Sequence, residues 1–405
     1  MKLTFKVVLA IVTVLLSSCI EEYTISSKKV SSVVDNTIVI QGRVLSGGES
    51  VVYISKTSPL GSTEKPESVE SAKVFIVGQK GYKSEVAVYS QERECYIINT
   101  EELEGNDTYA LNVEVNGESY ASDFLTLQAT PEIDSVTYKE REDGVSIHVS
   151  TQNAEDASQY YMWSYEEDWE FYAPLDFIGM QGIPVYSEKF YDMEIVDGRN
   201  PYLYCWKHTE SGNIFIYGTE NLQENSVKDV ELLRIPIDDI RISYIYSILV
   251  KQFCLSKEAY NYYKTLELYT ENNGGLFTPM PNELKGNVNC ISNPDLKVYG
   301  YVLASNITTK RLFIYESDFE QIRSEYENGE CGFLIPDPEN PNWYHSWSQM
   351  INNGGAVAMT IKGDYAPFDN PDYLDSKLYF RECVDCRSVK GSTKKRPDFW
   401  PNNHE

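Results

Sequence analysis

Apolar and polar residues follow a strand-like pattern through the first third of the chain. The runs TIVIQGRVL (37–45) and SVVYISKTS (50–58) are rich in β-branched residues and are separated by Gly47-Gly48. The run TYALNVEVNGESYASDF (108–124) alternates apolar with polar positions, and its Asn116-Gly117 pair is a strong hairpin signal. The pattern therefore predicts short β-strands joined by tight turns.

About six or seven such strands fit into residues 36–130, because further runs occur at 72–89 and 95–99. Their number and spacing indicate a β-sandwich of immunoglobulin-like or carboxypeptidase-regulatory-like fold. The stretch QATPEIDSVTY (128–138) marks a domain junction, since Pro131 cannot donate to a β-ladder. Strand patterns resume after it, so residues 131–405 are predicted to form a larger β-rich domain.

One segment of this second domain has a helical period instead. Ala259, Tyr262, Tyr263, Leu266 and Tyr269 fall on one face of a helix that is predicted from Ser256 to about 272. Ser256 is a good N-cap, and the Asn-Gly-Gly at 273–275 ends the helix. The apolar stripe is expected to pack into the core. The whole chain is therefore mostly β, with one prominent helix.

The first residues have a different pattern. Lys2 and Lys6 precede an apolar stretch of about ten residues, which is too short to span a bilayer and is typical of a secretory signal. The following Leu-Ser-Ser-Cys resembles the bacterial lipobox, in which the cysteine is acylated and becomes the first residue. We predict a signal peptide at 1–18 and a lipid on Cys19, although an ordinary signal peptide could also contain a cysteine.

Residues 19–35 are rich in serine and charge and are predicted to be a flexible tether. Ile20-Glu21-Glu22 resembles the acidic surface-export signal of Bacteroidota lipoproteins, although acidic residues there could also be plain linker. The predicted location is the outer membrane, lipid-anchored and facing the cell exterior.

Charge excludes one class of partner. The chain has 61 acidic and 35 basic residues, a formal net charge of -26. Binding to a phosphate backbone needs clustered Lys and Arg, so no nucleic-acid partner is expected. The 31 tyrosines suit half-buried sheet faces and equally suit ligand-contact surfaces.

Catalytic motifs are not recognisable in the sequence. It has no nucleophile elbow, zinc-protease motif or phosphate loop. The acidic clusters EEDWE (166–170) and IDDI (237–240) are expected to be solvated surface, although two carboxylates suffice for a glycosidase. The stretches WEFY and NWYHSW supply candidate ligand-contact residues, with structural anchoring as the alternative: Trp169, Tyr172, Trp343, Tyr344 and Trp347. No cofactor is predicted.

The cysteines indicate structure rather than chemistry. Cys383 and Cys386 form a CxxC in a polar C-terminal stretch, where neither a redox helix nor a second zinc pair is evident. The four histidines are not in metal-ligand spacing, so no metal site is predicted. Structural disulfides are favoured, and Cys95, alone in a predicted strand, is expected to stay unpaired.

Several C-terminal stretches occur in a familiar order. They are CW (205–206), the segment 256–290 that contains the helix, VYGYVLAS (298–305) and CVDCRSVKGSTKKRPDFW (383–400). Together with the lipobox and the sandwich, they resemble the Bacteroidota outer-membrane lipoproteins catalogued as domain of unknown function 4249. The resemblance implies a two-domain β-rich body that is frequently encoded beside a TonB-dependent transporter, and it implies no established reaction.

Four cysteines lie in the stretches that resemble this family: Cys205, Cys290, Cys383 and Cys386. Two bridges among them would tie residues 381–405 to the sheet, and three pairings are open. The pairing of Cys254 and Cys331, outside these stretches, is left undecided. Phe399 and Trp400 are expected to dock into the core.

The expected function is that of a non-catalytic surface lipoprotein that assists a TonB-dependent transporter in nutrient capture or uptake, with an unknown ligand. Alternatives are a surface hydrolase acting on glycan or peptide, and a protein of adhesion or envelope assembly. Asp134-Ser135-Val136 resembles the O-glycosylation acceptor of Bacteroidota, which makes Ser135 a candidate modification site.

Overall fold

The structure is a computed structural model, and it describes residues 37–58, 65–152, 159–174, 181–182, 202–211, 214–222, 224–271, 284–320, 331, 333–334, 356–360 and 376–401. The chain is mostly β, as its sequence predicts. Among the described residues there is one α-helix, and no helix there is both long and apolar enough to cross a bilayer.

The N-terminal part is a β-sandwich. One of its sheets is formed by β1 (Ile38–Ser46), β2 (Gly48–Lys56), β5 (Cys95–Thr100) and β4 (Val88–Ser90). The facing sheet has five strands: β17 (Val288–Cys290), β7 (Glu118–Ser122), β6 (Thr108–Val115), β3 (Lys73–Gly78) and β8 (Leu125–Thr126). The predicted hairpin at Asn116-Gly117 joins β6 to β7, and both residues have positive φ.

Strand alternation explains why this sandwich has a core. Ile40, Val44 and Val52 point between the two sheets and are fully buried, while Arg43 and Tyr53 point to the opposite face. A strand whose side chains alternate in this way can bury one face and leave the other for a different contact.

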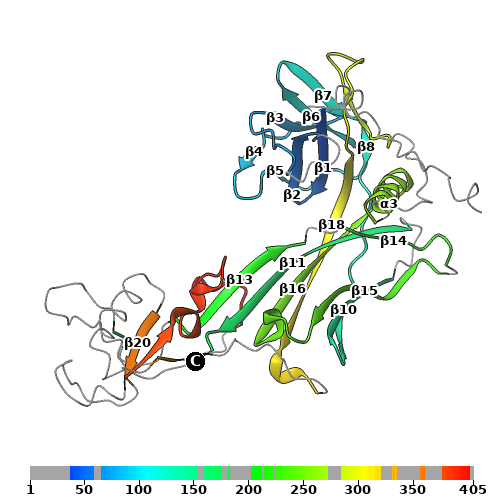
Figure 1. The fold of residues 1–405 in the computed structure, drawn as a ribbon. Helices are drawn as coiled ribbons and strands as arrows, with labels where there is room; N and C mark the ends of the chain where they lie inside the picture. Colours follow the sequence, from blue (N-terminus) through cyan, green and yellow to red (C-terminus); the bar gives the residue numbers. More distant parts are fainter. Residues whose placement is uncertain are drawn as a thin grey trace, which may run out of the picture.

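The first sheet does not stop at the sandwich. Strand β1 pairs in parallel with β18 (Val302–Tyr315), so that Gly42 lies opposite Val302. The sheet then continues through β16 (Ile245–Cys254) and β11 (Tyr160–Tyr172) to β13 (Tyr204–Glu210) and β14 (Phe215–Gly218), giving nine strands in all. Figure 1 shows β18 running from the sandwich, beside β1, into the larger part of the molecule.

Because of this connection, the sandwich contains strands from both predicted ranges, 36–130 and 131–405. Strands β17 and β18 belong to the range 131–405, yet they complete the two sheets of the sandwich. Gly300 makes the contact possible: its φ is +111°, and a Cβ there would lie 1.9 Å from the carbonyl oxygen of Ile40. Only glycine allows so close a backbone approach.

A second layer covers one face of the large sheet. It is the three-stranded sheet of β15 (Ser226–Pro236), β10 (Gly144–Gln152) and β9 (Ser135–Arg141), seen beside β16 in Figure 1. Val145 and Ile147 pack there against Trp163 and Tyr246, and all four are fully buried.

Helix α3 (Lys257–Glu271) covers the opposite face. The backbone N–H of Ala259 donates to the hydroxyl of Ser256 (3.2 Å), which confirms the predicted N-cap. Ala259 and Tyr262 are buried, and Tyr263 and Leu266 pack against the same core, as the periodicity predicts.

The remaining described elements are short. A four-stranded sheet contains β12 (Gln181–Gly182), β20 (Ala356–Thr360), β21 (Ser376–Phe380) and β19 (Phe333–Leu334). Single 3-10 turns are η1 (Ile240–Ile242), η2 (Glu316–Asp318), η4 (Arg381–Cys383) and η5 (Cys386–Ser388).

Two disulfides tie down the C-terminal segment. Cys205 in β13 pairs with Cys386, with 5.6 Å between their Cα atoms, as one of the three expected pairings requires. Cys383 pairs with Cys331 rather than with Cys290. The prediction for Cys290 is therefore wrong, because it is a buried free thiol in β17. Strand β17 pairs with β7 of the sandwich, which lies far from the red C-terminal segment in Figure 1.

Two further buried cysteines among the described residues are unpaired. Cys95 is free, as predicted, and Cys254 is free as well. Beyond the bridges, Trp400 docks as expected: it is buried, and its Nε1 donates to Glu170 (2.8 Å). Phe399 stays half-exposed under the guanidinium of Arg311, 3.6 Å from the ring centroid.

Candidate ligand-binding cleft

A cleft of about 660 Å³ opens on the face of the large sheet that α3 partly covers. Its walls come from β1 and β2 of the sandwich, from β11 and β16 of the larger part, and from α3. The lining side chains most relevant to binding are Arg43, Tyr53, Arg93, Glu166, Lys251, Phe253 and Tyr263.

Strand alternation directs these side chains into the cleft. On β1, Arg43 lies on the face opposite the buried Ile40 and Val44. On β16, Lys251 and Phe253 face the cleft, whereas Tyr246 lies in the core on the other side of the sheet. The continuous sheet therefore presents residues from both parts of the chain on one surface.

The floor of the cleft is apolar. Leu45, Met162 and Phe253 are buried beneath it, and together with Tyr263 and Leu266 of α3 they form one hydrophobic cluster. This surface is rigid, because it is the core that attaches the helix to the sheet.

Charged residues occupy the rim. Arg93 pairs with Glu49 (3.0 Å) and Glu210 (3.2 Å), and so joins the sandwich to β13. Lys251 pairs with Glu166 across the neighbouring strands. Each carboxylate of the rim thus has a cation partner, and Arg93 is shared between two of them.

Arg43 differs from the other cations of the cleft. Its guanidinium lies over the ring of Phe253, with 5.4 Å between its central carbon and the ring centroid. Within the described part of the chain, no carboxylate lies at ion-pair distance from it.

Neutral hydroxyl groups complete the lining. Burial raises the pKa of Tyr53, and burial also raises the pKa of Tyr263, with Arg43 acting in the opposite sense on both. A phenol with a raised pKa stays protonated at neutral pH and can donate a hydrogen bond.

A second cavity, of about 550 Å³, lies near the start of α3. The side chain of Asn287, which lines it, already bonds both backbone groups of Val302 (2.7 and 2.8 Å). The larger cleft, which combines an apolar floor with charged groups from both parts of the chain, is the candidate site.

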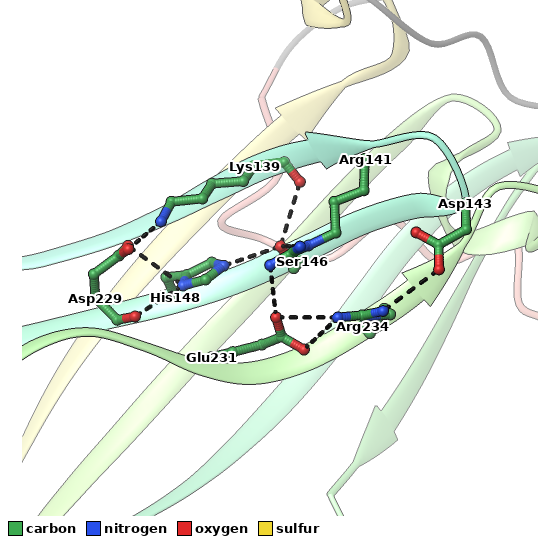
Figure 2. A network of polar contacts seen from close by, with 8 residues as sticks. All are labelled: Lys139, Arg141, Asp143, Ser146, His148, Asp229, Glu231 and Arg234. Carbon is green, nitrogen blue, oxygen red and sulfur yellow. Dashed lines mark hydrogen bonds and ion pairs between the residues drawn. The ribbon is translucent and has the colours of Figure 1, made fainter.

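A serine, a histidine and an aspartate also converge outside the cleft (Figure 2). His148 Nδ1 donates to the carbonyl oxygen of Asp229 (3.0 Å) and lies 3.3 Å from its carboxylate. Its Nε2 is 2.9 Å from the hydroxyl of Ser146, which also accepts from Arg141 (2.9 Å).

These three residues are arranged like a catalytic triad, but Ser146 is not accessible to a substrate. A nucleophile must reach its substrate, and Ser146 is 0% exposed beneath Arg141. The ion pairs around it join neighbouring strands: Lys139 with Asp229, Arg141 with Glu231, and Arg234 with both Glu231 and Asp143 (Figure 2). This group holds β9, β10 and β15 together.

Residues 167–170 of the acidic run on β11 are buried, contrary to the solvated surface expected from the sequence, and Glu166 is half-buried on the cleft rim. Glu167 accepts from Arg241 and from Tyr246, both at 2.8 Å. Asp168 pairs with His208 (2.7 Å) and Arg311 (3.2 Å). These partners come from other segments, so the run alone could not reveal them.

The five aromatic residues predicted as ligand contacts differ in their positions in the structure. Trp169 is 5% exposed within the core, so it anchors structure and is not a ligand contact. Tyr172 is partly exposed and packs edge-on against Tyr204 and Tyr244 on the surface. Trp343, Tyr344 and Trp347 lie outside the described residues.

Of the two predicted modification sites, the structure describes only Ser135. Cys19 lies outside the described residues. Ser135 begins β9, is half-buried and pairs with Ser150 in the ladder.

The cleft was not predicted from the sequence. The signal in the sequence that could have indicated it is the charged Arg43 inside the largely apolar strand β1.

Comparison with known proteins agrees with the resemblance seen in the sequence. The family model described as "Domain of unknown function (DUF4249)" matches residues 20–311. The stretch 383–400 lies outside this match, and no curated protein matches the chain. Among the described residues, no group of three or more His, Cys, Asp or Glu side chains could hold a metal ion. Since the match covers well over half of its length, the chain belongs to the DUF4249 family.

Proposed function

We propose that the protein is a non-catalytic, surface-exposed outer-membrane lipoprotein that captures a small nutrient for a TonB-dependent transporter. The observation that carries the proposal is the cleft on the large sheet. Its volume of about 660 Å³ is within the roughly 300–1,000 Å³ that is usual for small-molecule sites.

The composition of the cleft supports binding. Its floor is apolar and rigid, and a few polar groups stand around it, among them Arg43 and the neutral hydroxyl of Tyr53. Such a combination gives affinity through the floor and orientation through the polar groups. The Cys19 pattern and the family membership support a place at the outer membrane.

A cleft-filling variant tests the proposal. Ser164 is half-buried on β11 and lines the cleft, so Ser164→Trp should block it. Ser119→Trp, at an exposed position of β7, is the matched control. Each native protein is purified from its membrane, and its bound small molecules and partner proteins are identified by mass spectrometry.

The expected result is that wild type and Ser119→Trp carry the same small molecule and co-purify with a transporter, whereas Ser164→Trp loses the small molecule. A wild-type protein that carries no small molecule and no transporter would contradict the proposal.

The alternative is a surface hydrolase, for which the three carboxylates on the cleft rim are the candidate acidic groups. A glycosidase needs one carboxyl group that is kept protonated as an acid. Here Glu49 and Glu210 both pair with Arg93, and Glu166 pairs with Lys251, which argues against that role. Release of product from a glycan or peptide library by wild type, lost in Glu166→Gln, would establish the alternative.

A further inference from the structure

Three cations and three carboxylates line the cleft, but they are not paired one to one. Arg93 takes two of the carboxylates, and Lys251 takes the third. Arg43 is left without a carboxylate partner among the described residues, and its charge faces the open space of the cleft.

The position of Arg43 is well suited to a single anion. Its guanidinium is half-buried and lies against the ring of Phe253, which limits its rotamers without using its N–H donors. A planar guanidinium matches a carboxylate with two parallel hydrogen bonds.

The surroundings select against higher charge. Glu49, Glu166 and Glu210 share the rim, and the chain as a whole carries a net charge of -26. The three cations and three carboxylates of the lining balance, so a bound monoanion leaves one excess negative charge and a dianion such as a phosphate monoester leaves two, which makes the monoanion the less repelled ligand.

The apolar floor of the cleft indicates the chemistry of the rest of the ligand. Tyr263 and Leu266 of α3, both half-buried, offer an apolar surface above the buried Phe253, and Tyr53 stands near with a neutral hydroxyl. We propose that the cleft binds a small monocarboxylate with an apolar body, its carboxylate on Arg43 and its body on Tyr263 and Leu266 of α3. This inference rests on the proposed capture function.

A pair of probes that differ only in charge tests it. Binding of 4-phenylbutyrate and of its neutral amide to the full-length protein in detergent is measured by isothermal titration calorimetry. Since a hydrogen bond to a charged group is worth roughly 1.5–3 kcal/mol, the carboxylate should bind about 10- to 150-fold more tightly than the amide.

Variants assign the difference to one residue. Arg43→Gln should remove the preference for the carboxylate, and Arg43→Lys, which keeps the charge, should retain part of it. Arg234→Gln changes a half-exposed arginine of the three-stranded sheet and should leave both affinities unchanged. Circular dichroism confirms that each variant is folded.

Equal affinity of wild type for both probes, no binding of either at millimolar concentration, or an unchanged preference in folded Arg43→Gln would each overturn the inference. The proposed function is judged separately, by the small molecule that wild type carries and Ser164→Trp loses. A neutral or cationic native ligand would therefore refute the carboxylate and leave capture standing.

Discussion

Removal of the Cys205–Cys386 bridge should strongly destabilise the protein. The bridge closes a loop of 181 residues, for which the chain-entropy relation gives about 5 kcal/mol at 25 °C. The Cys331–Cys383 bridge lies inside this loop and spans 52 residues; shortening the loop by that span lowers the result by only about 0.3 kcal/mol. Measured disulfide contributions are often smaller, so a loss of about 3–5 kcal/mol is expected.

The assay is guanidinium unfolding of wild type and of Cys205→Ala/Cys386→Ala, followed by tryptophan fluorescence under oxidising conditions. Trp206 and Trp400 lie in one small cluster near the bridge and report on the C-terminal attachment. Cys290→Ala, which removes a buried thiol without a bridge, is the control. A loss below about 1 kcal/mol, or one no larger than that of the control, would refute the loop-closure argument.

Three further outcomes are expected. The hydrogen bond to Asp168 raises the pKa of His208 above 6.5. The stability that protonated His208 contributes is therefore complete below pH 6.5 and is lost as pH rises through the raised pKa. Thermal melts of His208→Gln at increasing pH should not show this loss of stability. Gly300→Ala should cost more than about 2 kcal/mol in urea unfolding, while Gly105→Ala, with open space around it, should be tolerated. Cys19→Ser should move the protein to soluble fractions, and retention in alkaline-washed membranes would contradict the lipid anchor.

The sequence pattern was sufficient to predict elements whose contacts are between residues close together in the chain. The alternation in 108–124 predicts β6, β7 and their hairpin, and the stripe from Ala259 to Leu266 predicts the buried face of α3. These elements are defined by neighbours in sequence, which is the information that periodicity contains.

Long-range pairing could not be predicted in this way. Gly42 lies opposite Val302 in a parallel ladder, and nothing near either residue specifies the other. The candidate cleft depends on that pairing, because it brings Arg43 of β1 to the same face as Phe253 of β16. The choice of Cys331 over Cys290 has the same origin, since β17 is held in the sandwich.

The buried acids show a related limit. Glu167 and Asp168 lie on β11, which is covered on both faces, and such strands ordinarily read as apolar. Their charges are compensated by Arg241, His208 and Arg311, from three other segments. Composition of the run alone therefore pointed to the surface.

The parallel pairing of β1 also sets how the molecule resists force. Any tension on the chain that precedes Ile38 enters the folded body through β1, which is hydrogen-bonded to β2 on one side and to β18 on the other. A pull along the strand loads both ladders in shear, so that many hydrogen bonds must break together instead of one at a time. Strand β1 is thus hydrogen-bonded on both sides, and β18 transmits the force directly to the larger part of the protein.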